Sequence, residues 1–199
     1  MPFLLLASKS PRRRELLAQI GVQCDVVDVD VEEQCGECET PFDYVQRLAK
    51  TKALAGYNAM SSQADIAVLG SDTVVVIDDQ LLEKPQNEAE SRMMLQLLSG
   101  REHRVLTAVA VCGNTGQEGF ECCILVSTSK VLFRSISDVE ISRYWMSGEP
   151  KDKAGSYGIQ GFGAVFVRHI EGSYSGVMGL PLFETQQLLS HFNVSYWQQ

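Results

Sequence analysis

Strand-like and helix-like segments alternate along this chain, and this alternation restricts its fold more than any other feature of the sequence. An apolar run covers 3–7, a helix-like stretch follows over 12–20 and ends before a glycine, and a second strand-like run covers 24–29. Such alternation is typical of α/β domains, in which helices pack on a central sheet. A length of 199 residues matches one such domain.

The rest of the chain continues this pattern after an acidic, irregular stretch over 30–39. A helix over 41–57 follows Thr40, whose hydroxyl can cap a helix N-terminus. Further helices are expected between Asn87 and Gly100, between Ser137 and Gly148, and over 181–192. Further strands are expected over 66–69, 74–77, 105–111, 122–133 and 164–167, with turns at Asp78-Asp79 and within 113–119. We therefore predict one α/β domain over residues 1–199, with a central twisted mixed sheet flanked by helices, either undivided or in two lobes around a substrate cleft.

The charge and hydropathy of the chain exclude two classes of partner. Its formal net charge is -8, whereas binding to a nucleic-acid backbone requires clustered basic residues. Any phosphate-binding site must therefore be a local basic pocket. The apolar N-terminal run is too short for a membrane span and has no basic flank before it, so we read it as a strand and not a signal peptide. We expect a cytoplasmic protein that binds neither nucleic acid nor membrane.

The cysteines are expected to be free thiols, because a chain of this length has its own core and carries no export signal. They are Cys24, Cys35, Cys38, Cys112, Cys122 and Cys123. The pair Cys35-x-x-Cys38 resembles half of a zinc knuckle or a redox motif, but a second pair at matching spacing is missing. We interpret this pair as loop thiols.

The segment Ser8-Lys9-Ser10-Pro11-Arg12-Arg13 lies between the first strand and the helix that follows it. A helix N-terminus presents unpaired N–H groups, hydroxyls add donors, and arginines make forked contacts with phosphate oxygens. The segment therefore predicts a phosphate site. The alternative is a serine-capped helix with a proline at its start and solvated arginines.

Two lysines could serve the same site. Lys52 lies on the margin of the apolar stripe of the helix over 41–57, where it can point toward a cleft or extend along the helix flank to solvent. Lys84 lies in Glu83-Lys84-Pro85, a segment stiffened by proline.

Asp72, in Gly70-Ser71-Asp72-Thr73, is the leading candidate for acid–base chemistry. A carboxylate between two apolar strand-like runs can hold a divalent metal or activate water, although it can also be a turn residue that binds its own backbone. Glu32 or Glu33 could supply a second carboxylate.

The glycine-rich segment over 152–161 completes the set. Its glycines permit close backbone approach to a ligand, and Gln160 offers both a donor and an acceptor to a base edge. By composition alone this segment is a flexible loop.

Taken in order, these clusters closely resemble the Maf family and cover nearly the whole chain. Members of that family are similar in carrying S-x-S-P-R-R after the first strand, E-E after the second, a lysine in the next helix, G-A/S-D-T, K-P and D-K-A-G-x-Y-G-I-Q-G. All of these occur here, with Ser71 as a minor departure from alanine. The resemblance implies a pyrophosphatase that converts a nucleoside triphosphate to the monophosphate and pyrophosphate. The last motif looks like that of the branch acting on dTTP and UTP, and unlike that of the sister branch acting on 7-methyl-GTP.

The resemblance also implies a role for each residue. Asp72 would be the catalytic proton acceptor, and Glu32 would help it to manage water and a divalent metal, Mg²⁺ or Mn²⁺. The residues implied to contact phosphates are Ser8, Ser10, Arg13, Lys52 and Lys84. Those implied to tune substrate choice are Arg12, Thr73 and Gln160. Two alternatives stay open, a non-catalytic nucleotide-binding regulator of cell division and a paralogue with another base preference. The oligomeric state, a homodimer included, is also open.

Overall fold

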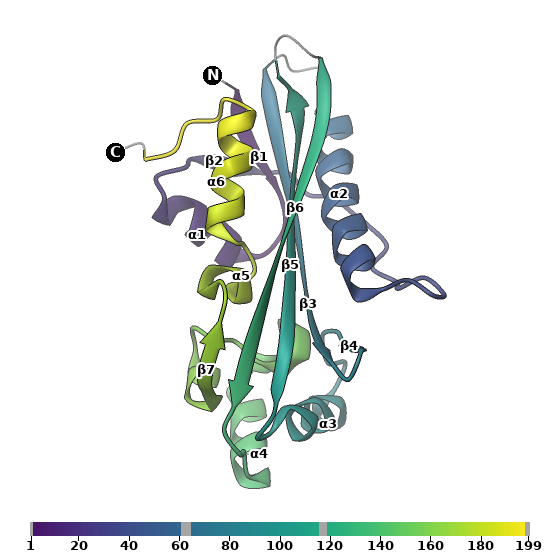
Figure 1. Cartoon of the computed structure of the whole chain (residues 1–199), viewed down its shortest axis with the longest axis vertical. Helices are drawn as coiled ribbons and strands as arrows, with labels where there is room; N and C mark the ends of the chain where they lie inside the picture. Colours follow the sequence, from purple (N-terminus) through teal and green to yellow (C-terminus); the bar gives the residue numbers. More distant parts are fainter. Residues whose placement is uncertain (1, 61–64, 116–118, 198–199) are drawn as a thin grey trace.

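The computed structural model describes residues 2–60, 65–115 and 119–197 and has a mixed α/β fold (Figure 1). The strands are β1 (Phe3–Ala7), β2 (Cys24–Val26), β3 (Ile66–Ile77), β4 (Gln80–Leu82), β5 (Glu102–Asn114), β6 (Phe120–Phe133) and β7 (Val167–Glu171). The α-helices are α1 (Pro11–Gln19), α2 (Pro41–Ala59), α3 (Glu88–Leu98), α4 (Asp138–Met146), α5 (Tyr174–Met178) and α6 (Leu182–His191). Short 3-10 helices are η1 (Glu149–Asp152), η2 (Ala154–Ser156) and η3 (Phe162–Phe166).

The described strands form one sheet in the order β2-β1-β3-β5-β6-β7, and β4 pairs with β3 outside this path. β1 runs parallel to β2 and β3, and the other pairs are antiparallel. The mixed central sheet flanked by helices confirms the predicted fold class. None of the helices in the described part of the chain is long and apolar enough to cross a membrane.

Long strands join two lobes. β3, β5 and β6 run through the length of the molecule in Figure 1, with α2 on one side of their upper half and α1 and α6 on the other. One buried cluster lies under α1 and α6, another lies under α2, and a third fills the lower lobe around α3, α4 and β4. The arrangement corresponds to the two-lobed alternative of the prediction.

Local signals fix the helix starts. The Thr40 hydroxyl accepts a hydrogen bond from the Asp43 amide at 3.1 Å, so the predicted cap of α2 is confirmed. Ser137 and Glu140 form a reciprocal capping box at the start of α4. Asn87 likewise accepts from the backbone of the first turn of α3. These residues satisfy amide groups that a helix cannot pair within itself.

β3 is one continuous strand, whereas the sequence predicted two strands separated at 70–73. The glycine marks a close packing contact and not a turn: a Cβ at Gly70 would meet the Ala49 carbonyl oxygen and lie 2.6 Å from the Ala53 nitrogen of α2. The strand also keeps its pairing with β5 throughout this interval. The absence of a side chain therefore lets α2 lie directly on the strand.

Other boundaries also differ from the prediction. The second strand ends at Val26 and not at 29, although the Val27 amide still donates to the Leu6 carbonyl of β1 at 3.1 Å. The expected strand over 164–167 is mostly η3, and the strand β7 begins only at Val167. The turn at Asp78-Asp79 is confirmed, with φ angles of 49° and 60°. The middle of the expected turn within 113–119 lies outside the described residues.

The expectation of free thiols is wrong for one pair. Cys112 and Cys122 form a disulfide with a Cα–Cα distance of 4.1 Å. They face each other directly in the β5–β6 register, which the sequence alone did not reveal. Cys35 and Cys38 are free and exposed, as expected of loop thiols, and Cys24 and Cys123 are also free.

Replacing Gly70 by alanine should destabilise the protein, because the added methyl group would collide with the α2 backbone. Overpacking of this kind costs about 1–3 kcal/mol or more. Gly36→Ala is the matched control, since its Cβ would have only ordinary contacts at 3.6 Å. Urea unfolding should show a clear loss of stability for Gly70→Ala alone, and equal stability of the two variants would contradict the packing argument.

Candidate active site

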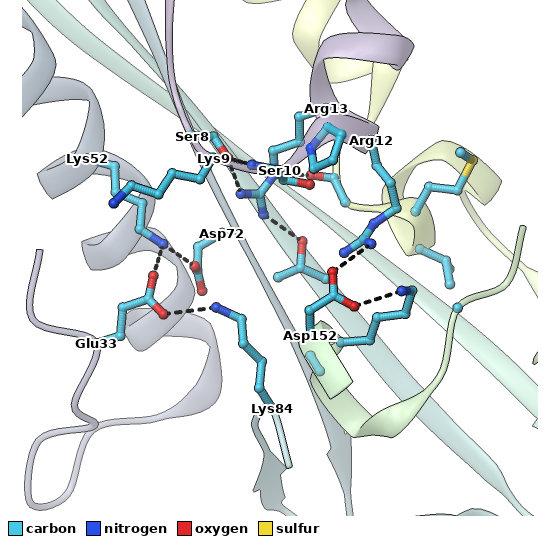
Figure 2. Close-up of a pocket in the computed structure, with 18 of the residues that line it drawn as sticks. Ser8, Lys9, Ser10, Arg12, Arg13, Glu33, Lys52, Asp72, Lys84 and Asp152 are labelled. Atoms are coloured by element: carbon cyan, nitrogen blue, oxygen red, sulfur yellow. Dashed lines mark hydrogen bonds and ion pairs between the residues drawn. The ribbon is translucent and has the colours of Figure 1, made fainter. Parts of the chain in front are cut away.

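A cavity of about 620 Å³ lies between the β1–α1 loop, α2, β3 and the η1–η2 segment (Figure 2). Its lining residues come from 7–13, 29–33, 72–75, 152–160 and 177–179, together with Lys52, Lys84 and Val105. Ligand pockets typically measure about 300–1,000 Å³, so this cavity has a suitable size for a nucleotide.

The edge of β3 beside the cavity is unpaired over a short interval. β1 pairs with β3 as far as Gly70, and β4 pairs with it again only from Val75. Asp72 and Thr73 lie in the interval between, and both line the cavity. The segment 8–13 leaves the carboxyl end of β1 at this point, which is where open α/β sheets bind ligands.

The cavity is more basic than the chain as a whole. Its basic lining residues are Lys9, Arg12, Arg13, Lys52, Lys84 and Lys153, and its acidic ones are Asp30, Glu33, Asp72 and Asp152. In a chain whose net charge is -8, this local excess of cations is what a phosphate-binding pocket would require.

Lys52 joins two carboxylates of the cavity. Its Nζ atom donates to Asp72 Oδ1 at 2.7 Å and to Glu33 Oε1 at 2.5 Å, while Lys84 Nζ donates to Glu33 Oε2 at 3.2 Å (Figure 2). The side chains of Lys52 and Asp72 are only 11% and 12% exposed. Lys52 therefore faces the cleft and does not extend to solvent, and Asp72 is a strand residue and not a turn residue.

The packing of α2 on β3 positions this pair. Side chains two residues apart on a strand point to the same face, so Asp72 points to the side on which Gly70 contacts α2. Lys52 belongs to the α2 turn between the two alanines that touch that glycine. The close helix–strand contact thus brings amine and carboxylate together.

Glu33, and not Glu32, lies in the cavity. Glu32 is exposed and is not among the lining residues, whereas its neighbour Glu33 is, so the role implied for Glu32 stays a prediction that Glu33 is better placed to fill. Burial by itself raises the pKa of Glu33, but the hydrogen bonds and charges of Lys52 and Lys84 outweigh it and lower this pKa below the ordinary value. Glu33 is therefore held in its charged form.

Arg13 connects four parts of the site. Its guanidinium donates to the Gly179 carbonyl at 2.8 Å, to Ser8 Oγ at 2.9 Å and to Thr73 Oγ1 at 3.3 Å. Arg13 therefore also has a structural role, which the sequence did not indicate: it ties α1 to Gly179 and to β3. The phosphate contact implied for it stays a prediction. Ser10 is the N-cap residue of α1 and Pro11 follows it, as the capped-helix alternative expected, but the Ser10 side chain makes no cap hydrogen bond and Arg13 is not solvated.

Arg12 reaches across the cavity to the other lobe. Its Nη1 atom lies 3.4 Å from Asp152 Oδ2, and Lys153 Nζ donates to Asp152 Oδ1 at 2.9 Å (Figure 2). Burial raises the pKa of Asp152, but these two cations lower it further than burial raises it. The sequence pointed to this segment but assigned no contact to Asp152.

Gln160 is exposed and lines the cavity at the end of a braced loop. The Glu149 carboxylate accepts hydrogen bonds from the Phe162 amide at 2.7 Å, the Gly163 amide at 3.1 Å and the Tyr144 hydroxyl at 2.8 Å. Sequence reasoning missed Glu149, which belongs to no recognised motif.

The glycines of this loop serve internal packing. A Cβ at Gly155, whose φ is 65°, would lie 2.8 Å from Val75, and one at Gly161 would collide with Glu149. They were expected to let the backbone approach a ligand. Gly155 and Gly161 let the loop close on β3 and on η1, while Gly158 lines the cavity, so the expected approach to a ligand stays a prediction.

The carboxylates of Asp72 and Glu33 suit a hard divalent cation. Mg²⁺ is usually bound through one or two carboxylates together with substrate phosphates and water. Both side chains line the same cavity, so by ligand type they are the residues that could hold such an ion beside the lysine that pairs with them.

Comparisons with known proteins give one consistent result. Residues 3–192 match the model of the Maf-like protein family. The dTTP/UTP pyrophosphatase of Saccharophagus degradans is 54% identical over 98% of this chain and 91% of its own length. Proteins with the same description from Alkalilimnicola ehrlichii and Vibrio cholerae are 50% and 53% identical, covering 98% and 95% of this chain and 95% and 97% of their own lengths. A nucleoside-triphosphatase (dITP/XTP pyrophosphatase) structure from Mycobacterium abscessus covers 94% of this chain and 92% of its own at 19% identity, with a TM-score of 0.43, too low to support an argument.

Glu33→Gln should reduce stability at neutral pH, and this difference from the unchanged protein should shrink as the pH falls. The pKa of Glu33 is lower in the folded protein than its ordinary value of 4.5. As the pH falls, Glu33 is therefore protonated in the unfolded chain before it is protonated in the folded one, and the stabilisation is lost below about pH 4.5. Glu32→Gln is the control and should change neither stability nor its pH dependence. Denaturant unfolding across that range measures both, and identical profiles for the two variants would contradict the placement of Glu33.

Proposed function

The chain belongs to the Maf family, and from that premise we propose that it hydrolyses dTTP and UTP to the nucleoside monophosphate and pyrophosphate. The relatives that bear this name cover more than nine-tenths of this chain at 50–54% identity. The observation that carries the proposal is Asp72, a carboxylate fixed by Lys52 at the unpaired edge of β3 and facing a basic cavity of nucleotide size.

The triphosphate would lie against the segment 8–13. The backbone N–H groups at the start of α1 are available to a phosphate, and so is the Ser10 hydroxyl, because it makes no capping hydrogen bond. Arg12 lines the cavity on the same side. Lys84 extends from the opposite side with 58% of its side chain exposed, which leaves it able to reach an incoming phosphate. These groups would stabilise the charge that develops on the leaving pyrophosphate.

Hydrolysis requires a base beside the α-phosphorus. Asp72 would accept a proton from water as the water oxygen forms a bond to the α-phosphorus and the bond from that phosphorus to the bridging α–β oxygen breaks. Pyrophosphate leaves with the bonding electrons. Lys52 would hold the carboxylate in place and balance its charge before proton transfer. A bound Mg²⁺ or Mn²⁺, held by Asp72 and Glu33, would neutralise phosphate charge.

The base would be selected by the loop that Glu149 braces. The Gln160 amide can donate to a carbonyl oxygen and accept from an N–H, which matches the O4 and N3–H edge shared by uracil and thymine. Cytosine presents an amino donor and a bare ring nitrogen at this edge. A site built for the first pattern would leave polar groups unpaired with the second.

Replacing the proposed base tests the reaction. Asp72→Asn keeps the side-chain shape and should lower turnover of dTTP by at least the roughly hundredfold typical of a lost general base. Asp30→Asn, a second acidic residue of the cavity lining, is the matched control and should retain most of the activity. Pyrophosphate release measures both, with circular dichroism to verify folding, and near-normal turnover of a folded Asp72→Asn protein would remove Asp72 from the mechanism.

Substrate choice is tested by comparing pyrimidines. We expect kcat/KM for dTTP and UTP to exceed that for CTP by at least about tenfold, which corresponds to roughly 1.4 kcal/mol. Gln160→Ala should narrow this ratio. The control is Gln186→Ala, whose side chain contacts Ser190 and Tyr196 outside the cavity lining and should leave the ratio unchanged. Equal kcat/KM values for CTP and UTP would refute base reading while leaving pyrophosphate release intact.

A further inference from the structure

Three side chains of metal-binding type meet away from the active-site cavity. Glu121 and Cys123 belong to β6, and His191 is the last residue of α6. His191 Nε2 lies 2.7 Å from Glu121 Oε2, and Cys123 Sγ lies 3.8 Å from the same oxygen. One ligand atom from each residue falls within 4.8 Å of the others.

The fold explains why they converge. Glu121 and Cys123 are two positions apart on β6 and therefore share one face of the sheet. Cys123 packs against the core cluster that contains Leu188 and Leu189 of α6, so this face is the one under that helix. The intervening Cys122 points away and is bonded to Cys112.

From this convergence we propose that Glu121, Cys123 and His191 form a binding site for a divalent transition metal of the zinc type. Thiolate sulfur, imidazole nitrogen and carboxylate oxygen are the three side-chain ligands of Zn²⁺, which binds each at about 2.0–2.3 Å. Donor atoms that already lie within 4.8 Å of one another need only small side-chain rotations to surround one such ion. Water would complete the tetrahedron.

The surroundings of the cluster favour a cation. Thr115 Oγ1 donates a hydrogen bond to Glu121 Oε1 at 3.1 Å, and Glu121 Oε2 points toward His191 and Cys123. Hydrogen bonds of this kind commonly orient a carboxylate that binds a metal. His191 ends a ten-residue helix, where the helix dipole is negative. The side chains of His191 and Glu121 are 47% and 23% exposed, so an ion can enter from solvent.

Binding would exchange existing contacts for metal bonds. The S–H bond of Cys123 breaks, its proton passes to solvent, and the sulfur electron pair binds the metal. The hydrogen bond between His191 Nε2 and Glu121 is replaced by two bonds to the ion, and the proton on Nε2 passes to solvent while Nδ1 carries the proton of the neutral ring. The metal would tie the end of α6 to β6, and it would be separate from the ion expected at the carboxylates of the active site.

Cobalt uptake by the full chain tests the site. With Mg²⁺ in excess to occupy hard-ligand sites, Co²⁺ should bind at one equivalent and give a thiolate-to-metal charge-transfer absorption that Zn²⁺ abolishes. Cys123→Ser should remove this absorption, and His191→Gln should weaken Co²⁺ binding by at least about tenfold. Zn²⁺ should raise the Tm of the unchanged chain but not that of Cys123→Ser.

The double variant Cys35→Ser/Cys38→Ser is the control, because these exposed thiols offer the other plausible cysteine ligands. It should retain the absorption and the Zn²⁺-dependent rise in Tm. Three results would overturn the proposal: no absorption with the unchanged chain, absorption that survives in Cys123→Ser, or absorption lost in the control. Circular dichroism of each variant separates loss of ligand from loss of fold.

Discussion

The contact between α2 and β3 at Gly70 is the constraint on which the rest of the site depends. Because no side chain separates the two backbones, Lys52 reaches Asp72 at 2.7 Å within a largely buried environment. A buried ion pair is weak evidence for stability, since desolvation of both charges offsets most of their attraction. The pair is better understood as a device that holds a carboxylate in one position.

The interruption of the β3 edge gives this carboxylate access to a ligand. Pairing with β1 ends where the interval begins and pairing with β4 begins where it closes, so the residues of β3 between them face the cavity and not a neighbouring strand on this edge. The chain continues from this end of β1 into the segment that begins α1. The start of α1, where we propose that phosphate binds, and a fixed carboxylate therefore meet at one interval of the sheet, and Arg13 joins them through Ser8 and Thr73.

Much of this arrangement could be predicted from the sequence, because its signals are local. Periodicity indicated the α/β class, and the caps at Thr40 and Ser137 follow from side-chain chemistry within one helical turn. The residues that the structure adds or reassigns depend on contacts distant in sequence. Glu33 and Glu32 are adjacent in an irregular stretch without periodicity, so only the position of Lys52 distinguishes them. The Cys112–Cys122 bond likewise depends on the register of the β5–β6 hairpin. The apolar pattern of two long strands does not determine that register.

We propose that the fixed carboxylate of Asp72 directs water to the α-phosphorus of a nucleoside triphosphate. Hydrolysis of dTTP in ¹⁸O-enriched water, followed by mass spectrometry of both products, tests this directly because the label marks the phosphorus that was attacked. Attack at the α-phosphorus should give one ¹⁸O atom in dTMP and none in the pyrophosphate at the moment of release. Label in pyrophosphate, or release of labelled orthophosphate with dTDP, would place the attack at another phosphorus and contradict the account.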